Sequence, residues 1–252
     1  MRLVGTVALV TGASSGIGEA AAISLAQQGA TVAVVARRRE RLEDLSARIG
    51  KDGGRVLVIE ADITQEAQAA EAVERTATEL GRIDTLVNNA GVMLLGPVQH
   101  APVAEWQRMV ETNVLGLLYC AHAALPHLIR AADDGPRYVS DMVNVSSVAG
   151  RIARTGSGVY NLTKHGVGAF SESLRQEVTR KHVRISLVEP GAVETELAGH
   201  NRPEVLETIR SNFDDVERMQ PEDIADAITY IVTRPRHVAI NEVLIRPTEQ
   251  ER

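Results

Sequence analysis

Short apolar runs alternate with longer segments of helical periodicity along the whole chain of 252 residues. The apolar runs predict seven strands, at residues 6–10, 31–36, 55–60, 84–88, 138–145, 183–188 and 242–245. Such alternation is typical of a parallel sheet covered by helices on both faces, and right-handed crossovers make the sheet doubly wound. We therefore predict one α/β domain spanning residues 1–252. An eight-stranded barrel of similar length is the alternative, but it predicts no phosphate-binding loop after the first strand.

The helices between these strands are predicted from apolar stripes that repeat every three or four residues. They lie at residues 17–28, in segments that end near 50 and at 80, at 102–130, at 160–181, and in a segment that begins at 221. Gly29 and Gly81 follow two of these helices, where a terminal glycine is favoured. Pro126 is expected to kink or split the long segment from residue 102, and residues 133–136 are expected to form a turn.

The charge and the cysteine content exclude several classes of function. The chain has 33 acidic and 27 basic residues and a net charge of −6, whereas a general nucleic-acid binder needs a basic surface. Cys120 is the single cysteine, which excludes an intramolecular disulfide and is typical of a reducing compartment. No run approaches the roughly 20 apolar residues of a membrane span, and the first strand begins too early to follow a signal peptide. We expect a cytoplasmic protein that binds neither nucleic acid nor membranes.

The seven histidines form no recognisable metal motif. His122 and His127 are five residues apart, which is a poor fit to one helix face, and no H-E-x-x-H pair is present. We expect no bound metal.

A glycine-rich turn, Thr11–Gly18, joins the first strand to the first helix. Glycines in such a turn let the backbone approach a pyrophosphate, and the helix N-terminus offers free N–H groups to the phosphates. The spacing is G-x-x-x-G-x-G, which departs from the G-x-G-x-x-G fingerprint. In its strand–turn–helix context the turn nevertheless predicts a dinucleotide site. The residues expected to contact the cofactor there are Gly12, Ser14, Ser15, Gly16, Ile17 and Gly18.

The residues after the second strand favour NADP(H) over NAD(H). An NAD site places a carboxylate near the end of that strand, to bind the ribose 2′-hydroxyl, but here Arg37 and Arg38 follow Ala36. A guanidinium suits a 2′-phosphate. Arg39 and Arg41 are expected to be solvated. After the third strand, Asp62 and Ile63 are expected at the adenine, although Asp62 and Thr64 could equally cap the next helix.

Tyr160 and Lys164 are four residues apart and share one face of a predicted helix. A phenol has a pKa of about 10, and a nearby ammonium lowers this pKa towards neutrality. Ser147, at the end of the fifth strand, could hold a carbonyl oxygen beside the phenol. This trio suits acid–base catalysis of hydride transfer. Alone, the tyrosine–lysine spacing is equally that of an exposed helix pair.

These motifs together resemble the short-chain dehydrogenases/reductases in order and spacing. The residues that carry the resemblance are Thr11–Gly18, Asn88–Gly91, Asn113, Ser147, Tyr160 with Lys164, and Pro190–Gly191. The resemblance covers essentially the whole chain. It implies a single-domain Rossmann fold with a seven-stranded sheet and, because of Arg37, a preference for NADP(H).

The resemblance also implies a role for each matching residue. Tyr160 would be the acid/base, Lys164 would bind the nicotinamide ribose and lower the tyrosine pKa, Ser147 would polarise the carbonyl, and Asn113 would hold a water of the proton relay. The residues implied to line the cofactor cleft are Asn89, Ala90, Gly91, Pro190, Gly191, Val193 and Thr195.

Three segments are most similar to the clavulanate dehydrogenase subfamily, whose members reduce an aldehyde. They are residues 88–98, 170–178 and 245–248. We expect an NADP(H)-dependent reductase of a small or medium aldehyde or ketone. Alternatives are a 3-oxoacyl reductase, a hydroxysteroid dehydrogenase, a 3-hydroxy acid dehydrogenase and a non-catalytic NADP-binding sensor.

The resemblance further implies a homotetramer, or a homodimer, built on the helices that begin at Pro102 and Tyr160. Residues 192–215 are expected to form an irregular, mobile cover over the substrate. Residues 92–95 and 148–151 are predicted equally as pocket or core. Arg151 and Arg154 could bind an anionic substrate group, but we favour a solvent-facing position for both.

Overall fold

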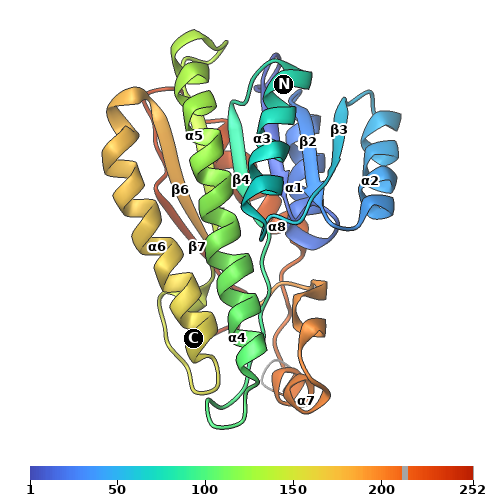
Figure 1. Cartoon of the computed structure of the whole chain (residues 1–252), viewed down its shortest axis with the longest axis vertical. Coiled ribbons are helices and arrows are strands. Elements are labelled where there is room, and N and C mark those ends of the chain that lie inside the picture. Colours follow the sequence, from blue (N-terminus) through green and yellow to red (C-terminus); the bar gives the residue numbers. More distant parts are fainter. Residues whose placement is uncertain (212–214, 252) are drawn as a thin grey trace.

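A parallel sheet of seven strands forms the centre of the chain (Figure 1). The computed structural model describes residues 1–211 and 215–251. The strand order is β3-β2-β1-β4-β5-β6-β7. The strands are β1 (Val7–Thr11), β2 (Thr31–Ala36), β3 (Val56–Glu60), β4 (Thr85–Asn88), β5 (Ser140–Val145), β6 (Val183–Pro190) and β7 (Glu242–Ile245). The predicted doubly wound α/β fold is confirmed, with each strand within two residues of its expected bounds.

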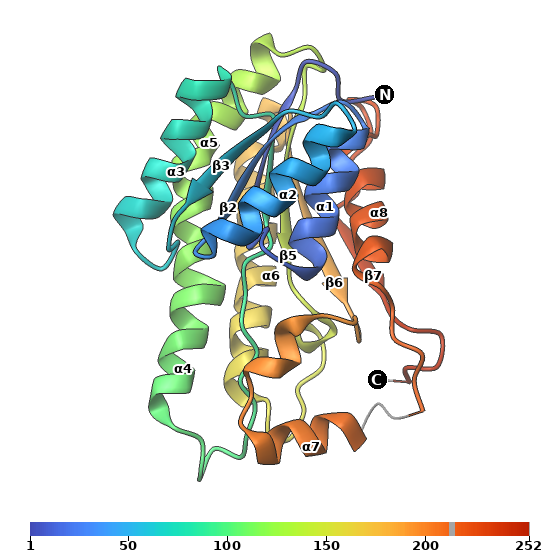
Figure 2. The same cartoon turned by 90° about the vertical axis from the view of Figure 1, so that its right-hand side faces the viewer.

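Helices cover both faces of the sheet, as the edge-on view shows (Figure 2). One layer consists of α1 (Gly16–Gln27), α2 (Arg39–Lys51) and α8 (Pro221–Val232). The other consists of α3 (Glu66–Leu80), α5 (Leu117–Asp134) and α6 (Gly158–Val178). Gly29 and Gly81 have positive φ angles of 95° and 87°, as their predicted positions after a helix require.

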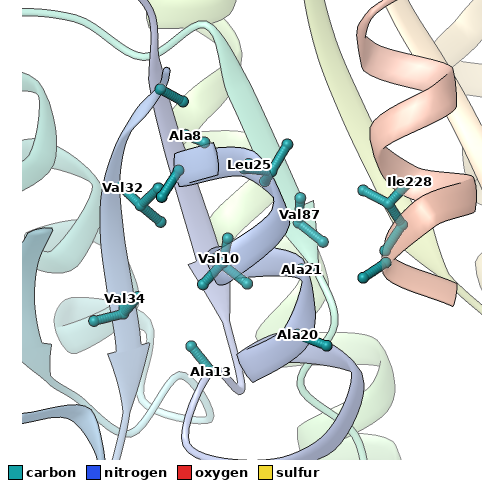
Figure 3. Packing of buried hydrophobic residues seen from close by; sticks show 14 of the residues in the cluster. Ala8, Val10, Ala13, Ala20, Ala21, Leu25, Val32, Val34, Val87 and Ile228 are labelled. Atoms are coloured by element: carbon teal, nitrogen blue, oxygen red, sulfur yellow. The ribbon is translucent and has the colours of Figure 1, made fainter. Parts of the chain in front are cut away.

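Small apolar side chains allow α1 to lie close to the sheet (Figure 3). Ala21 and Leu25 are four residues apart on one face of α1, and both are fully buried. They pack in one cluster with Val10 of β1, Val87 of β4 and Ile228 of α8. This packing fixes the start of α1 relative to the end of β1, and therefore fixes the glycine-rich turn between them.

The long helical segment is irregular at a different place from the one that the sequence suggests. A π-helical stretch, Glu111–Gly116, joins α4 (Val103–Val110) to α5, whereas Pro126 lies inside α5 without interrupting it. α5 also runs to Asp134, so the turn expected at residues 133–136 starts two residues later. A π-helical stretch widens the helix by one residue and is frequent at functional sites.

The same segment corrects the expectation that no stretch could span a membrane. The continuous helical stretch Val103–Asp134 is long enough to do so, and an 18-residue window within it has a mean hydropathy of 1.3. In this fold, however, its buried residues Cys120, Ala124 and Leu128 pack in the core beneath the sheet. One face of the stretch therefore belongs to the core, and burial of the Cys120 thiol raises its pKa to about 12.

The strand order reverses at the centre of the sheet. β1 pairs with β2 on one side and with β4 on the other, so the chain winds outward in both directions from the gap between β1 and β4. In open α/β sheets, ligands bind at the carboxyl ends of the strands at such a switch point. The glycine-rich turn and residues 89–91 both lie at this edge.

Candidate active site

The turn between β1 and α1 depends on glycines at two places. Gly12 has a φ angle of 65°, and a Cβ atom there would lie 2.7 Å from the Cα atom of Ala90. A Cβ atom at Gly18 would overlap the side-chain nitrogen of Asn89. At the start of α1, the side chain of the N-cap residue Ser15 makes no capping hydrogen bond. The first N–H groups of α1 are therefore not capped by that side chain, and the positive helix end suits a phosphate.

Thr11 and Asn89 tie the end of β1 to the end of β4. The Thr11 hydroxyl accepts hydrogen bonds from the backbone N–H groups of Asn89 (3.1 Å) and Ala90 (3.2 Å). In return, the Asn89 side chain donates to the carbonyl oxygen of Thr11 at 3.0 Å. These bonds hold residues 89–91 against the glycine-rich turn.

A cleft of about 310 Å³ opens above these ties. The predicted residues that line it are Gly12, Ser14, Ser15, Gly16, Ile17, Arg37, Arg38, Asp62, Ile63, Asn89, Ala90, Gly91, Ser147, Tyr160, Lys164, Pro190, Gly191, Val193 and Thr195. Two predicted residues lie outside it. Gly18 lies beneath Asn89, and Asn113 lies behind Gly91, where a Cβ atom would be 3.3 Å from the Asn113 Oδ1 atom. The lining also includes residues that the sequence did not single out as site residues, among them Thr112, Ser146, Glu196, Leu197 and His200.

Arg37 and Arg38 both reach the cleft at the end of β2. The Arg38 guanidinium donates to the hydroxyls of Ser14 (2.9 Å) and Ser15 (2.8 Å) and forms an ion pair with Glu196. Arg41 is exposed, as a solvated residue would be, and it also pairs with Glu196 at 3.1 Å.

Asp62 does not cap the following helix. Its carboxylate accepts hydrogen bonds from the backbone N–H group (3.1 Å) and the hydroxyl (2.8 Å) of Thr64, whereas the N-cap residue of α3 is Gln65. This local turn holds Asp62 and Ile63 at the edge of the cleft.

Tyr160, Ser147 and Lys164 come together from β5 and α6. Ser147 follows β5, and its hydroxyl accepts a hydrogen bond from the backbone N–H group of Ala149 at 3.1 Å. Tyr160 and Lys164 are both buried on α6. The Lys164 ammonium donates to the carbonyl oxygen of Val145 at 3.0 Å and lies 5.8 Å from the centre of the Tyr160 ring. The exposed helix pair considered from the sequence is therefore excluded.

Burial dominates the titration of both groups. Desolvation raises the pKa of Tyr160 to about 12, although a hydrogen bond with Ser147 opposes the shift. Desolvation lowers the pKa of Lys164 to about 8. The tyrosine pKa therefore shifts in the opposite direction to the one expected from a neighbouring lysine, because desolvation of the buried phenol outweighs the hydrogen bond with Ser147.

Asn113 lies in the π-helical stretch and is buried. Its side chain bonds to both backbone groups of Val92, at 2.8 Å each, and donates to the Thr163 hydroxyl at 3.2 Å. These bonds use both N–H groups of the amide and one lone pair of its oxygen, which leaves the side chain little capacity to hold a relay water. The side chain instead holds Val92 at the wall of the cleft.

The segment after β6 covers one side of the cleft. Gly191 and Ala192 are bound to the C-terminal region, since Gly191 donates to the carbonyl oxygen of Ile245 at 2.7 Å and Ala192 to the Gln250 side chain at 2.9 Å. Thr195 lies against the glycine-rich turn, because a Cβ atom at Gly16 would be 3.0 Å from its methyl group.

Most of the described part of residues 192–215 is helical rather than irregular, which corrects the expectation of a loop. A 3-10 helix spans Glu196–His200 and α7 spans Pro203–Ser211, while residues 212–214 lie outside the described residues. Asn201 joins this segment to the irregular residues that follow β4. Its side chain accepts from the N–H group of Leu95 at 2.7 Å and donates to the carbonyl oxygen of Met93 at 2.8 Å.

The remaining candidates are mostly structural. Val92 and Leu94 are both buried. Val92 also lines the cleft, so it belongs both to the core and to the wall of the pocket. Arg151 is not free in solvent, because it pairs with the buried Glu189 and with Glu242. Within the described residues, no three histidine, cysteine, aspartate or glutamate side chains form a cluster that could hold a metal.

Comparisons with known proteins agree with this geometry. The sequence profile of the family described as short chain dehydrogenase matches residues 6–206. An uncharacterized oxidoreductase of Staphylococcus aureus (strain USA300) is 32% identical over 245 residues, which are 97% of this chain and 98% of the relative.

Solved structures of other dehydrogenases and reductases match the fold of this chain over nearly its whole length. The closed form of a serine dehydrogenase complexed with NADP+ has a TM-score of 0.89 and 32% identity, over 98% of this chain and 97% of that one. A 3-ketoacyl-(acyl-carrier-protein) reductase from Brucella melitensis, complexed with NADH, has a TM-score of 0.85 and 29% identity, over 97% and 98% of the two chains.

Proposed function

We propose, from the premise that this chain belongs to the short-chain dehydrogenase family, that it is an NADP(H)-dependent reductase of small or medium aldehydes or ketones. The observation that carries the proposal is a single cleft that contains both a phosphate-binding turn and the Ser147, Tyr160 and Lys164 side chains. A module that only binds a nucleotide has no need of a buried proton donor beside the site.

The cleft fits a dinucleotide on grounds of shape and charge. The space around Gly12 admits a backbone but no side chain, and the start of α1 has no side-chain cap. We assign NADP(H) rather than NAD(H) because Arg37 and Arg38 follow β2 and no carboxylate stands at its end. The NADP+ complex of the serine dehydrogenase supports this choice.

In the proposed mechanism, Tyr160 donates the proton in carbonyl reduction. Its high pKa keeps the phenol protonated at neutral pH, as a general acid must be. The Ser147 hydroxyl holds the carbonyl oxygen beside the phenol. The bound nicotinamide supplies the hydride in reduction and accepts it in oxidation. The carbonyl oxygen thus gains a proton from Tyr160 as the carbon is reduced.

Lys164 then stabilises the phenolate that proton transfer leaves behind. With a pKa of about 8 the lysine is mostly protonated at pH 7, so its charge is available within the low-dielectric site. Its ammonium is held by Val145 and has further N–H donors for a ribose hydroxyl. We propose that the backbone carbonyl of Asn113 holds the water through which Tyr160 regains a proton.

The substrate is proposed more narrowly from the resemblance to the clavulanate dehydrogenase subfamily, which favours an aldehyde. A 3-hydroxy acid is the second candidate, because the serine dehydrogenase fold matches over nearly the whole chain. A 3-oxoacyl reductase, a hydroxysteroid dehydrogenase and a non-catalytic NADP sensor remain alternatives. The homotetramer and the cytoplasmic location also remain predictions.

Parallel fluorescence titrations with NADPH and NADH test the cofactor assignment. We expect NADPH to bind at least tenfold more tightly than NADH, and Arg37→Asp to remove this preference, because the substitution replaces a guanidinium with a charge that repels the 2′-phosphate. Arg39→Asp is the matched control, since Arg39 pairs with Glu43 on α2 and does not line the cleft. Equal binding of both cofactors by the unmodified protein would show that the Arg37 assignment is wrong.

A further inference from the structure

The carboxylate of Glu196 lies between two arginines at one end of the cleft. Arg38 donates to one of its oxygens at 2.7 Å, and Arg41 donates to the other at 3.1 Å. The arginines belong to the start of α2, whereas Glu196 begins the 3-10 helix that follows Thr195. The pairing therefore joins the predicted ribose-phosphate end of the cleft to the segment that covers it. It also holds the pKa of Glu196 below its usual value.

The other donors of Arg38 are already in use within the glycine-rich turn. Its Nε and Nη2 atoms donate to the Ser14 hydroxyl, and Nη2 also donates to the Ser15 hydroxyl. The Nη1 atom, which Glu196 binds, is the remaining terminal nitrogen. A guanidinium binds carboxylates and phosphates through the same donors. Glu196 thus engages, as an internal anion, guanidinium donors of Arg38 and Arg41 that could otherwise bind a phosphate.

We propose that Glu196 is a specificity-determining residue that competes with the cofactor 2′-phosphate for Arg38 and Arg41. The inference rests on the proposed binding of NADP(H). A phosphate at this place must either displace the Glu196 carboxylate or lie beside it against charge repulsion. A ribose with a free 2′-hydroxyl neither displaces the Glu196 carboxylate nor is repelled by it. Glu196 therefore weakens binding of the phosphorylated ribose selectively and limits the preference that the arginines create.

The expected size of the effect follows from exposure. The side chains of Arg38, Arg41 and Glu196 are all close to half exposed, at 45%, 52% and 43%. Ion pairs with this exposure are weak and are screened by salt. We therefore expect removal of the Glu196 charge to change affinity by about three- to tenfold, and by less at high ionic strength.

Calorimetric titration of Glu196→Gln tests the proposal. The probes are adenosine 2′,5′-bisphosphate and AMP, which differ by the 2′-phosphate and lack the nicotinamide, so that the readout does not depend on catalysis. We expect the variant to bind the bisphosphate about three- to tenfold more tightly than the unmodified chain does, with AMP affinity changed less than twofold. Glu43→Gln is the matched control, because Glu43 pairs with Arg39 off the cleft.

Three outcomes would overturn the inference: unchanged bisphosphate affinity, weaker bisphosphate affinity, or an equal gain for both probes. The gain in bisphosphate affinity caused by Glu196→Gln should also be smaller when Arg38 is replaced by Gln, because Glu196 and Arg38 act on the same phosphate. Failure of the proposed cofactor assignment looks different. The unmodified chain would then bind the two probes equally, and a preference that emerged only in Glu196→Gln would support the inference while correcting the assignment. Equal binding in both chains would overturn both.

Discussion

Lys164 illustrates how a single residue can serve catalysis at a cost to stability. Its charged form is buried in the folded chain and solvated in the unfolded one, which is why its pKa falls from 10.5 to about 8. At pH 7 the lysine is charged in both states, so folding bears the full cost of burying the charge. Between about pH 8 and pH 10.5 the folded chain loses the proton first, and this cost disappears as the pH rises.

We therefore predict that Lys164→Met stabilises the chain at pH 7 while abolishing turnover. Methionine keeps most of the volume but removes the charge, and it loses the hydrogen bond to Val145. We expect a net gain of about 1–2 kcal/mol in the free energy of unfolding at pH 7. Denaturant unfolding at several pH values measures it. The gain should shrink steadily from pH 8 to pH 10.5, and a gain independent of pH would argue against a buried charge.

Among the secondary-structure elements, the bounds of the strands are predicted well by hydrophobic periodicity, whereas irregularities within helices are not predicted by single residues. The strands at residues 31–36 and 242–245 have the predicted bounds because β-branched runs bounded by turn residues have few other stable conformations. The π-helical stretch at Glu111–Gly116 has no such signal, because no local residue pattern marks it, although Asn113 within it bonds to the distant residue Val92. Proline at position 126 suggests a break that tertiary packing overrides.

Some residues of the candidate site can likewise be predicted from the sequence, and others cannot. The glycine-rich turn, Tyr160 and Lys164 could be found because short spacings along one element determine how they meet. Glu196 and Asn201 could not, because each acts on a segment about 100 or more residues away. The spacing of Tyr160 and Lys164 predicts a lowered pKa for Tyr160, whereas burial, which this spacing does not reveal, raises it.

Alanine substitutions at two glycines, one in the glycine-rich turn and one in α6, should have opposite effects on stability. At Gly12, a positive φ angle and the nearby Ala90 backbone make alanine incompatible, so Gly12→Ala should abolish cofactor binding and lower stability. Gly166 lies on α6, where an added Cβ atom would meet open space within 4 Å. Gly166→Ala should therefore stabilise the chain by about 0.5–1 kcal/mol through helix propensity alone. Thermal unfolding and NADPH titration of both variants test this contrast, and tolerance of alanine at Gly12 would contradict the proposed turn.

The whole molecule exposes apolar side chains on elements that the family resemblance assigns to subunit contacts. Leu162 of α6 is 62% exposed and Val103 of α4 is 60% exposed. Burial of such residues against a second copy offsets the exposure and favours closed symmetry. The predicted homotetramer would bring these helices together in a shared interface.

Light scattering coupled to size-exclusion chromatography measures this assembly. We predict a mass four times the 27.2 kDa of one chain, and a lower mass for Leu162→Asp, because a buried aspartate would be uncompensated in the interface. Gln176→Asp, on the same helix at an already polar position, is the control. A monomeric mass for the unmodified chain would show that the exposed apolar residues have another role.

The central claim is that Tyr160 delivers the proton in NADPH-dependent carbonyl reduction. The most direct test is NADPH oxidation against a panel of aldehydes and ketones, measured for the unmodified chain, for Tyr160→Phe, and for Tyr138→Phe as a matched control. Tyr138 is exposed and does not line the cleft. We predict that Tyr160→Phe lowers turnover by about 10²–10⁴-fold while NADPH still binds, and that Tyr138→Phe changes neither. Full turnover by Tyr160→Phe would contradict the mechanism.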